Sequence, residues 1–175
     1  MISSNAAALF QIDPFKALAK SQLVAKMALE NDIMMLQETH ADQFDLHDRC
    51  PQVSESHWCT ASQGPIRATG GVLTLISKKW LGDRIPLSST IAEGRVFRTE
   101  IRSDTSSLVI YNIHNFDLEL QQMKEIEHLV KRDTAEVNSD PTRRSVILAG
   151  DWNFCPDDEP GLDLKNAPDN FAAIS

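Results

Sequence analysis

The chain has 175 residues, of which 42% are hydrophobic and 24% charged, with a formal net charge of −8. This is the composition of one globular domain, and no apolar run reaches the roughly 20 residues of a membrane-spanning helix. The N-terminus lacks an export signal, and three cysteines without a C-x-x-C pair support neither a disulfide framework nor a zinc site. We expect an intracellular protein, cytoplasmic or nuclear, without a membrane segment. The acidic balance argues against a large basic face but neither supports nor excludes a nucleic-acid substrate.

The first half of the chain predicts a helix followed by a buried strand. The helix spans Phe15 to Glu30, with Pro14 just inside its start and Asp13 as its N-cap. Apolar residues recur there at helical spacing and should form one face against a sheet: Phe15, Leu18, Ala19, Leu23, Val24 and Met27. The stretch IMMLQETH then has the pattern of a parallel strand that is covered on both faces. Glu38 would lie at the carboxyl end of this strand.

The second half predicts four more strands and one helix. The segment from Ala41 to Arg67 has no clear period and is assigned to a loop. The strands are Gly70–Lys78, Arg95–Arg102, Ser107–Asn115 and Val146–Ala149. Between the last two, a helix over Leu118–Arg132 should bury one side: Leu118, Met123, Ile126, Leu129 and Val130. The residues after Phe154 show no period. The alternation of strands and helices predicts an α/β fold.

Three of these strands end in polar residues of one chemical kind. Glu38 lies at the end of the first, Tyr111–Asn115 form the end of the second, and Asp151 and Asn153 follow the third. In an extended segment residues two apart point the same way, so Asp151 and Asn153 can face one point. Because ligands bind at the carboxyl ends of strands in open α/β sheets, the three ends can converge on one site. Oxygen ligands without a thiolate favour Mg²⁺ or Mn²⁺ over zinc.

Each of these features is also common for ordinary structural reasons. A glutamate after a strand is often solvated, Asp-x-Asn is typical of a turn, and a single histidine such as His114 is usually a hydrogen-bonded structural residue. The ordered set carries more weight than its members. DIMMLQETH, GGVLTLISK, YNIHNF and VILAGDWNF together resemble the endonuclease/exonuclease/phosphatase superfamily, which includes DNase I, exonuclease III and retrotransposon endonucleases. The match covers essentially the whole chain, and LQET and GDWN are its most specific parts.

The resemblance implies a fold and a reaction. The fold is a partial four-layer α/β sandwich, in which two packed mixed β-sheets are flanked by helices, formed by residues 1–175 as one domain. The reaction is divalent-metal-dependent hydrolysis of phosphodiesters, in a DNA endonuclease of the retroelement type. Mg²⁺ or Mn²⁺ would be the cofactor and DNA the partner; the oligomeric state stays open.

The resemblance also implies roles for residues at the strand ends. Metal ligation falls to Glu38 and Asn5. The residues that orient the attacking water and contact the phosphate are Asp151, Asn153 and His114. Further substrate contacts at the same strand end fall to Tyr111, Asn112 and Asn115, within an alignment that can shift by one or two residues.

The sequence departs from the family pattern near its C-terminus. Family members continue through further strands of the second sheet to an Asp-His pair, whereas this chain ends at Ser175 and its last histidine is His128. We therefore expect the C-terminal part of the second sheet to be missing, and little or no Mg²⁺-dependent nuclease activity. Two other functions stay open, because fold does not fix substrate. They are a non-catalytic remnant of the scaffold, and a phosphatase or phosphodiesterase acting on inositol lipids or sphingomyelin.

Overall fold

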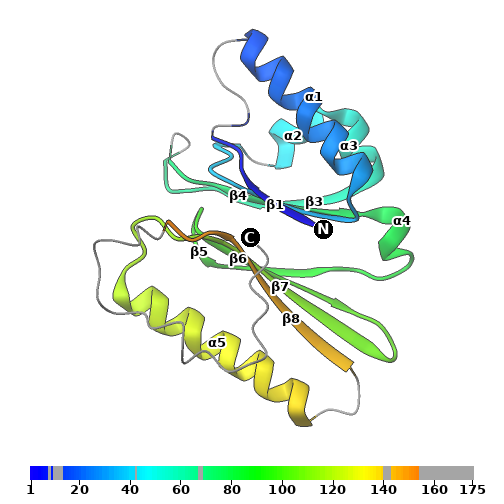
Figure 1. The fold of residues 1–175 in the computed structure, drawn as a ribbon. Helices are drawn as coiled ribbons and strands as arrows, with labels where there is room; N and C mark the ends of the chain where they lie inside the picture. The colour runs from blue at the N-terminus through cyan, green and yellow to red at the C-terminus, as the bar shows by residue number, and fades with distance from the viewer. Residues whose placement is uncertain (8, 10–13, 42, 67–68, 140–142, 154–175) are drawn as a thin grey trace.

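The computed structural model describes residues 1–7, 9, 14–41, 43–66, 69–139 and 143–153. It contains two four-stranded sheets, packed face to face, with helices on their outer faces (Figure 1). Across the first sheet the strands are β1 (Ile2–Asn5), β2 (Ile33–Gln37), β4 (Val72–Ser77) and β3 (His57–Ser62). Across the second they are β5 (Leu87–Ala92), β6 (Val96–Arg102), β7 (Ser106–His114) and β8 (Arg143–Asp151). The helices are α1 (Pro14–Glu30), α2 (Gln43–Arg49), α3 (Pro51–Ser56), α4 (Lys78–Leu81) and α5 (Leu120–Ser139).

Each sheet contains one parallel pair, and the two pairs matter most for the site. β1 runs parallel to β2, and β7 runs parallel to β8, whereas the other neighbouring strands are antiparallel. β1 and β8 are the edge strands of their sheets within the described residues. Figure 1 shows these two edges, one blue and one orange, on facing layers of the molecule. The carboxyl ends of four strands therefore meet at one edge.

The alternation of side chains along the strands builds three apolar layers. Between the sheets lie Ile33, Met35, Ile76, Leu81, Ile101, Ile110 and Ala149. On the outer face of the first sheet, Met34 and Leu36 of β2 pack with Leu73, Leu75 and residues from α1, α2 and α3. On the outer face of the second sheet, Val109, Tyr111 and Ile113 pack under α5. All five residues of β2 are buried, as its apolar run predicts. The four-layer α/β sandwich is thus confirmed.

The helix α1 is confirmed, but its predicted apolar face is confirmed only for Val24, which is buried, and Met27, which packs against the core. Phe15 is 83% exposed, and Leu18 and Leu23 also face outward. The side toward the sheet consists mainly of small residues: Ala17, Ser21, Val24, Ala25 and Ala28. These allow the helix to approach the sheet closely, and the larger side chains stay outside. Asp13, the expected N-cap, lies outside the described residues.

The loop predicted from Ala41 to Arg67 is also wrong, because it contains α2, α3 and β3. These elements have only six or seven residues each, too few to establish a helical or strand period. The short β1, α4 and β5 gave no recognisable pattern either. The second predicted helix is confirmed as α5: Leu118, Ile126, Leu129 and Val130 pack on the second sheet, whereas Met123 is exposed. None of the described helices is long and apolar enough to cross a membrane.

A buried ion network ties α5 to the second sheet. Asp133 of α5 is 1% exposed and accepts hydrogen bonds from Arg98 Nε at 2.8 Å and from Tyr111 Oη at 2.7 Å. Arg98 also reaches Glu100, which accepts a second bond from Arg102. Burial acts to raise the pKa of Asp133, but these hydrogen bonds outweigh it and hold the pKa below its usual value. The network keeps Tyr111 on the α5 side of the sheet.

Replacing Asp133 should destabilise the protein strongly. Asp133→Ala leaves Arg98 buried without this partner, so we expect a loss of about 3–5 kcal/mol in the free energy of unfolding in urea. Because the folded pKa of Asp133 is lowered, its contribution is complete at neutral pH and is lost as pH falls below about 4. Glu127→Ala, which removes an exposed pair with Lys131, is the control and should change the midpoint little. Equal effects of the two variants would contradict this account of the network.

Candidate active site at the strand ends

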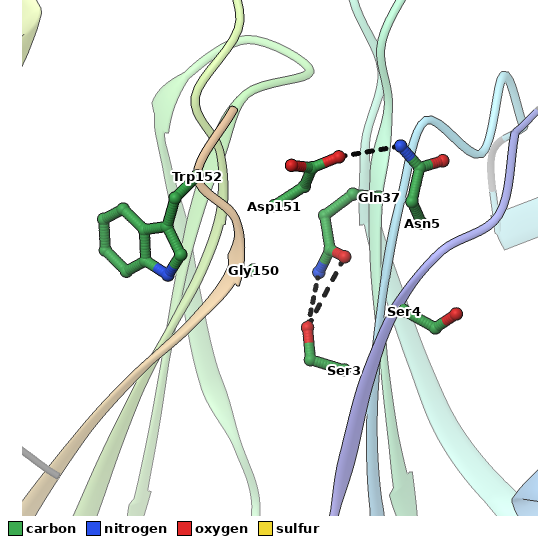
Figure 2. A pocket seen from close by; sticks show the side chains of 7 residues that line it. All are labelled: Ser3, Ser4, Asn5, Gln37, Gly150, Asp151 and Trp152. Carbon is green, nitrogen blue, oxygen red and sulfur yellow. Dashed lines mark hydrogen bonds between the residues drawn. The ribbon is translucent and has the colours of Figure 1, made fainter. Parts of the chain in front are cut away.

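The two sheets present inward-facing polar residues at the ends of their parallel pairs. Asn5 ends β1 beside Gln37 of β2, and His114 ends β7 beside Asp151 of β8. The Nδ2 atom of Asn5 donates a hydrogen bond to Oδ2 of Asp151 at 2.8 Å, across the gap between the sheets (Figure 2). Glu38 follows β2 directly, and its Oε1 lies 3.5 Å from Nε2 of His114. Strands far apart in sequence thus bring Asn5, Glu38, His114 and Asp151 together.

Asp151 is held in place by its own turn as well as by Asn5. Its Oδ1 accepts a hydrogen bond from the backbone N–H of Asn153 at 3.1 Å. Asn153 is exposed and has a left-handed φ of 47°, so the chain turns after Asp151 instead of continuing as a strand. Asp151 and Asn153 therefore do not belong to one extended strand, and the expectation that their side chains face one point for that reason is wrong. Before Asp151, Gly150 permits close pairing, because a Cβ there would lie 1.8 Å from the carbonyl oxygen of Ile113.

Backbone strain is concentrated at this edge. Among the described non-glycine residues, those with positive φ are Ala7, Glu38, His40, Asp117 and Asn153. Each follows the end of β1, β2, β7 or β8 within a few residues. A left-handed backbone costs on the order of 1 kcal/mol for most residue types, and such strain clusters at functional sites. The backbone thus marks this edge independently of the side chains.

His114 is a neutral hydrogen-bond donor in this arrangement. Its imidazole is 1% exposed, and Nη1 of Arg95 lies 3.0 Å from Nδ1. Arginine only donates, so Nδ1 must accept, and the ring proton sits on Nε2, which faces Glu38. Burial, and then the charge of Arg95, hold the pKa of His114 below its usual value. The Nε2 atom has no hydrogen-bond partner within the described residues, so it is a buried donor aimed at the site.

Arg95 is a functional candidate that the sequence did not reveal. It precedes β6, is half-buried, and forms no ion pair with another described residue. Its guanidinium carbon lies 5.1 Å from the centroid of the Phe116 ring. It lines a cleft of about 460 Å³ together with Glu38, His40, Thr69, Gly70, Phe116 and Asp117. A partly buried cation without a carboxylate partner favours an anion in this cleft.

A second hollow lies beside the Asn5 to Asp151 hydrogen bond. It has a volume of about 200 Å³ and is lined by Ser3, Ser4, Asn5, Gln37, Gly150, Asp151 and Trp152. Figure 2 shows the Gln37 and Ser3 side chains bonded to each other within it, and the Trp152 ring turned away from Asn5. Asp151 is thus accessible from this side.

The structure does not bring three of the predicted substrate contacts to the site. The side chain of Tyr111 points toward α5, because alternate residues of β7 face opposite sides of the sheet. Asn112 faces inward but is fully buried, donating to the carbonyl of Leu73 and accepting from Gln37. Asn115 donates to the carbonyl oxygen of Trp152 at 2.8 Å. Asn112 and Asn115 therefore act as structural ties around the site.

The donor chemistry at this edge fits a hard divalent cation. Glu38 and Asp151 contribute carboxylates, and Asn5 contributes a carboxamide, with no thiolate in the group. Asn5, however, presents its nitrogen to Asp151, and its Oδ1 accepts from the backbone N–H of Ala7. Within the described part of the chain, no three His, Cys, Asp or Glu side chains already form a metal cluster. The two carboxylates fit the ion best, whereas Asn5 links the sheets.

The comparisons with known proteins show the family and support the fold. The model of the endonuclease/exonuclease/phosphatase family matches residues 5–171, and the chain belongs to that family. No curated protein matches the sequence. Solved structures with a similar fold include truncated TDP2 from Caenorhabditis elegans, with a TM-score of 0.59, 18% identity, and coverage of 87% of this chain and 61% of that one. The APE2 catalytic domain from Xenopus laevis gives a TM-score of 0.57 and 18% identity, over 87% of this chain and 57% of that one.

A third similar structure is D. rerio TDP2 complexed with single strand DNA product. Its TM-score is 0.55 and its identity 18%, over 87% of this chain and 60% of that chain. At these identities the likeness shows a shared fold. The chain spans between 57% and 61% of the length of these three matched proteins.

Removing the Arg95 side chain should change the protonation of His114. In the metal-free protein, Arg95→Met removes the positive charge that lowers the pKa of His114, so we expect this pKa to rise. At neutral pH, the ¹⁵N shifts of His114 should show the Nε2–H tautomer in the wild type and a mixture in the variant. Arg84→Met, which alters a cation-π contact with Trp80, is the control. An unchanged tautomer and pKa in Arg95→Met would contradict the assigned role of Arg95.

Proposed function

We propose that this protein hydrolyses phosphodiesters in a reaction that depends on a divalent metal, with DNA as the substrate. The observation that carries the proposal is the convergence of Glu38, His114 and Asp151 with the guanidinium of Arg95 at one edge. Family membership supports the reaction class, and similarity to TDP2 and APE2 supports DNA as substrate. Mg²⁺ or Mn²⁺ is the proposed ion, and a cytoplasmic or nuclear location would suit such a substrate.

Each side chain has a role that its contacts make possible. Glu38 would hold the metal, which supplies charge neutralisation at the phosphate. Asp151 is kept in orientation by Asn5 and by the backbone of Asn153, so it can align a water molecule and accept its proton.

His114 and Arg95 stabilise negative charge on the phosphate. The neutral His114 donates from Nε2 without adding a charge that would repel a metal ion. Arg95 attracts the phosphate into the cleft, and the exposed amide of Asn153 adds a donor that does not repel it.

A DNA endonuclease of the retroelement type is the finer proposal, and it rests on the LQET and GDWN motifs. The main alternative within the same chemistry is a phosphodiesterase acting on inositol lipids or sphingomyelin. A non-catalytic scaffold is the alternative outside it.

The test uses the purified chain with Mg²⁺ or Mn²⁺ and supercoiled plasmid. We expect slow nicking that falls on the order of 10²- to 10³-fold in Glu38→Gln and in Asp151→Asn, because each removes one electrostatic group of the site. Tyr111→Phe is the control, since Tyr111 lies on the other face of β7. Isothermal titration calorimetry should show weaker Mn²⁺ binding by Glu38→Gln.

Three results would contradict the proposal or redirect it. Nicking that persists in both site variants would show a contaminating nuclease. Mn²⁺ and DNA binding without any hydrolysis would favour the non-catalytic scaffold. Release of phosphate or headgroup from an inositol lipid or from sphingomyelin, without nicking, would favour the alternative substrates.

A further inference from the structure

Phe116 has an exposed side chain and lines the cleft that contains Glu38 and Arg95. Its side chain is 47% exposed, although it lies only two residues after the buried His114. The backbone N–H of Phe116 donates to the carbonyl oxygen of His114 at 2.9 Å, which fixes the turn that presents the ring. An exposed aromatic ring in a fixed turn, beside a candidate active site, indicates a binding role for the ring.

Two side chains lie against the Phe116 ring, and the rest of the residue is largely exposed. The His114 imidazole is stacked on the ring, with centroids 5.9 Å apart and planes inclined by 13°. Arg95 also lies over the ring, and its Nη1 is 3.0 Å from Nδ1 of His114. Groups on opposite faces of a ring are separated by about 7 Å, twice the usual contact distance of 3.5 Å. We infer that His114 and Arg95 cover the same face, which leaves the opposite face for the exposed part of the ring.

This arrangement fits a planar ring that is joined to an anion. A nucleotide has both parts, and base-aromatic stacking tolerates every base because each has a π-face. The cleft volume of about 460 Å³ is within the range of small-molecule sites. A base inside a duplex already stacks on both faces, so only an unpaired or extruded base can reach Phe116.

We propose that the open face of Phe116 is a stacking site for an unpaired base of the nucleic-acid substrate, next to the phosphate that is hydrolysed. This inference rests on the proposed function for its substrate class. Arg95 and His114 both contact the ring, and these contacts restrict its motion before the substrate binds. The protein should consequently prefer single-stranded segments or distorted duplexes over regular duplex DNA.

The test is a binding experiment without catalytic metal, so that no strand is cut. Fluorescent single-stranded oligonucleotides are compared with versions that carry one abasic residue at each position in turn. Phe116→Ala should weaken binding of the intact strand by roughly 5- to 100-fold, the range typical of one stacked base. Phe116→Trp should retain binding, and Phe116→Leu, which keeps apolar volume without a π-face, should behave like Phe116→Ala. Phe44→Ala, which removes another exposed phenylalanine on α2, is the matched control.

The decisive measurement is the coupling between the ring and one base. In the wild type, an abasic residue at one position should cause a loss similar to that of Phe116→Ala, and in Phe116→Ala the same abasic residue should cause no further loss. The fluorescence of the introduced tryptophan in Phe116→Trp should be quenched when the strand binds. Equal abasic losses in both proteins at every position would overturn the inference, as would unchanged tryptophan fluorescence at saturation.

Failure of this inference differs from failure of the proposed function. If the wild type binds no oligonucleotide but hydrolyses bis(p-nitrophenyl) phosphate in a Glu38-dependent manner, the stacking site is wrong and the phosphodiesterase remains. If the coupling is found but no phosphodiester is hydrolysed, the stacking site remains and the enzyme is wrong. Thermal unfolding of each variant by circular dichroism checks that the loss of binding does not come from unfolding.

Discussion

The hydrogen bond from Asn5 to Asp151 joins the last residues of two edge strands that belong to different sheets. Each strand runs parallel to its neighbour, so both neighbours end at the same edge and place Glu38 and His114 beside this bond. The inward direction of these residues follows from the same alternation that buries Met35, Ile110 and Ala149 between the sheets. The packing that stabilises the sandwich and the geometry that assembles the site therefore have one cause.

The charged groups of the site include both a set that suits a cation and a set that suits an anion. The site combines two carboxylates with a neutral histidine and with an arginine that has no ion pair in the described part of the chain. The Tyr111, Asp133 and Arg98 network lies on the opposite face of the second sheet and is fully paired by contrast. The left-handed residues are concentrated at the strand ends, where Nε2 of His114 is a buried donor without a hydrogen-bond partner among the described residues. Such concentration is typical of a functional site.

Much of this could be predicted from the sequence, because the relevant signals are local. The apolar runs of β2, β7 and β8 predict buried strands, and the polar residues after them predict Glu38, His114 and Asp151 at one edge. Arg95 could not be found in this way, since it belongs to no motif and only the packing of β6 against β7 brings it to His114. Phe116 ends the YNIHNF stretch, but nothing in the local sequence shows that its ring stays exposed beside the cleft. The buried face of α1 was predicted only in part, for another reason. Small residues form it, so the larger exposed side chains dominated the pattern.

The central claim is that four strand ends form one site for a divalent cation and a phosphate. Paramagnetic broadening of backbone amide signals by substoichiometric Mn²⁺ tests it directly, because the effect falls steeply with distance from the ion. The signals of Asn5, Glu38, His114 and Asp151 should broaden together and recover when Mg²⁺ is added in excess. Broadening that is confined to acidic residues in distant loops, such as Asp83 and Asp104, with these four signals unchanged, would contradict the account.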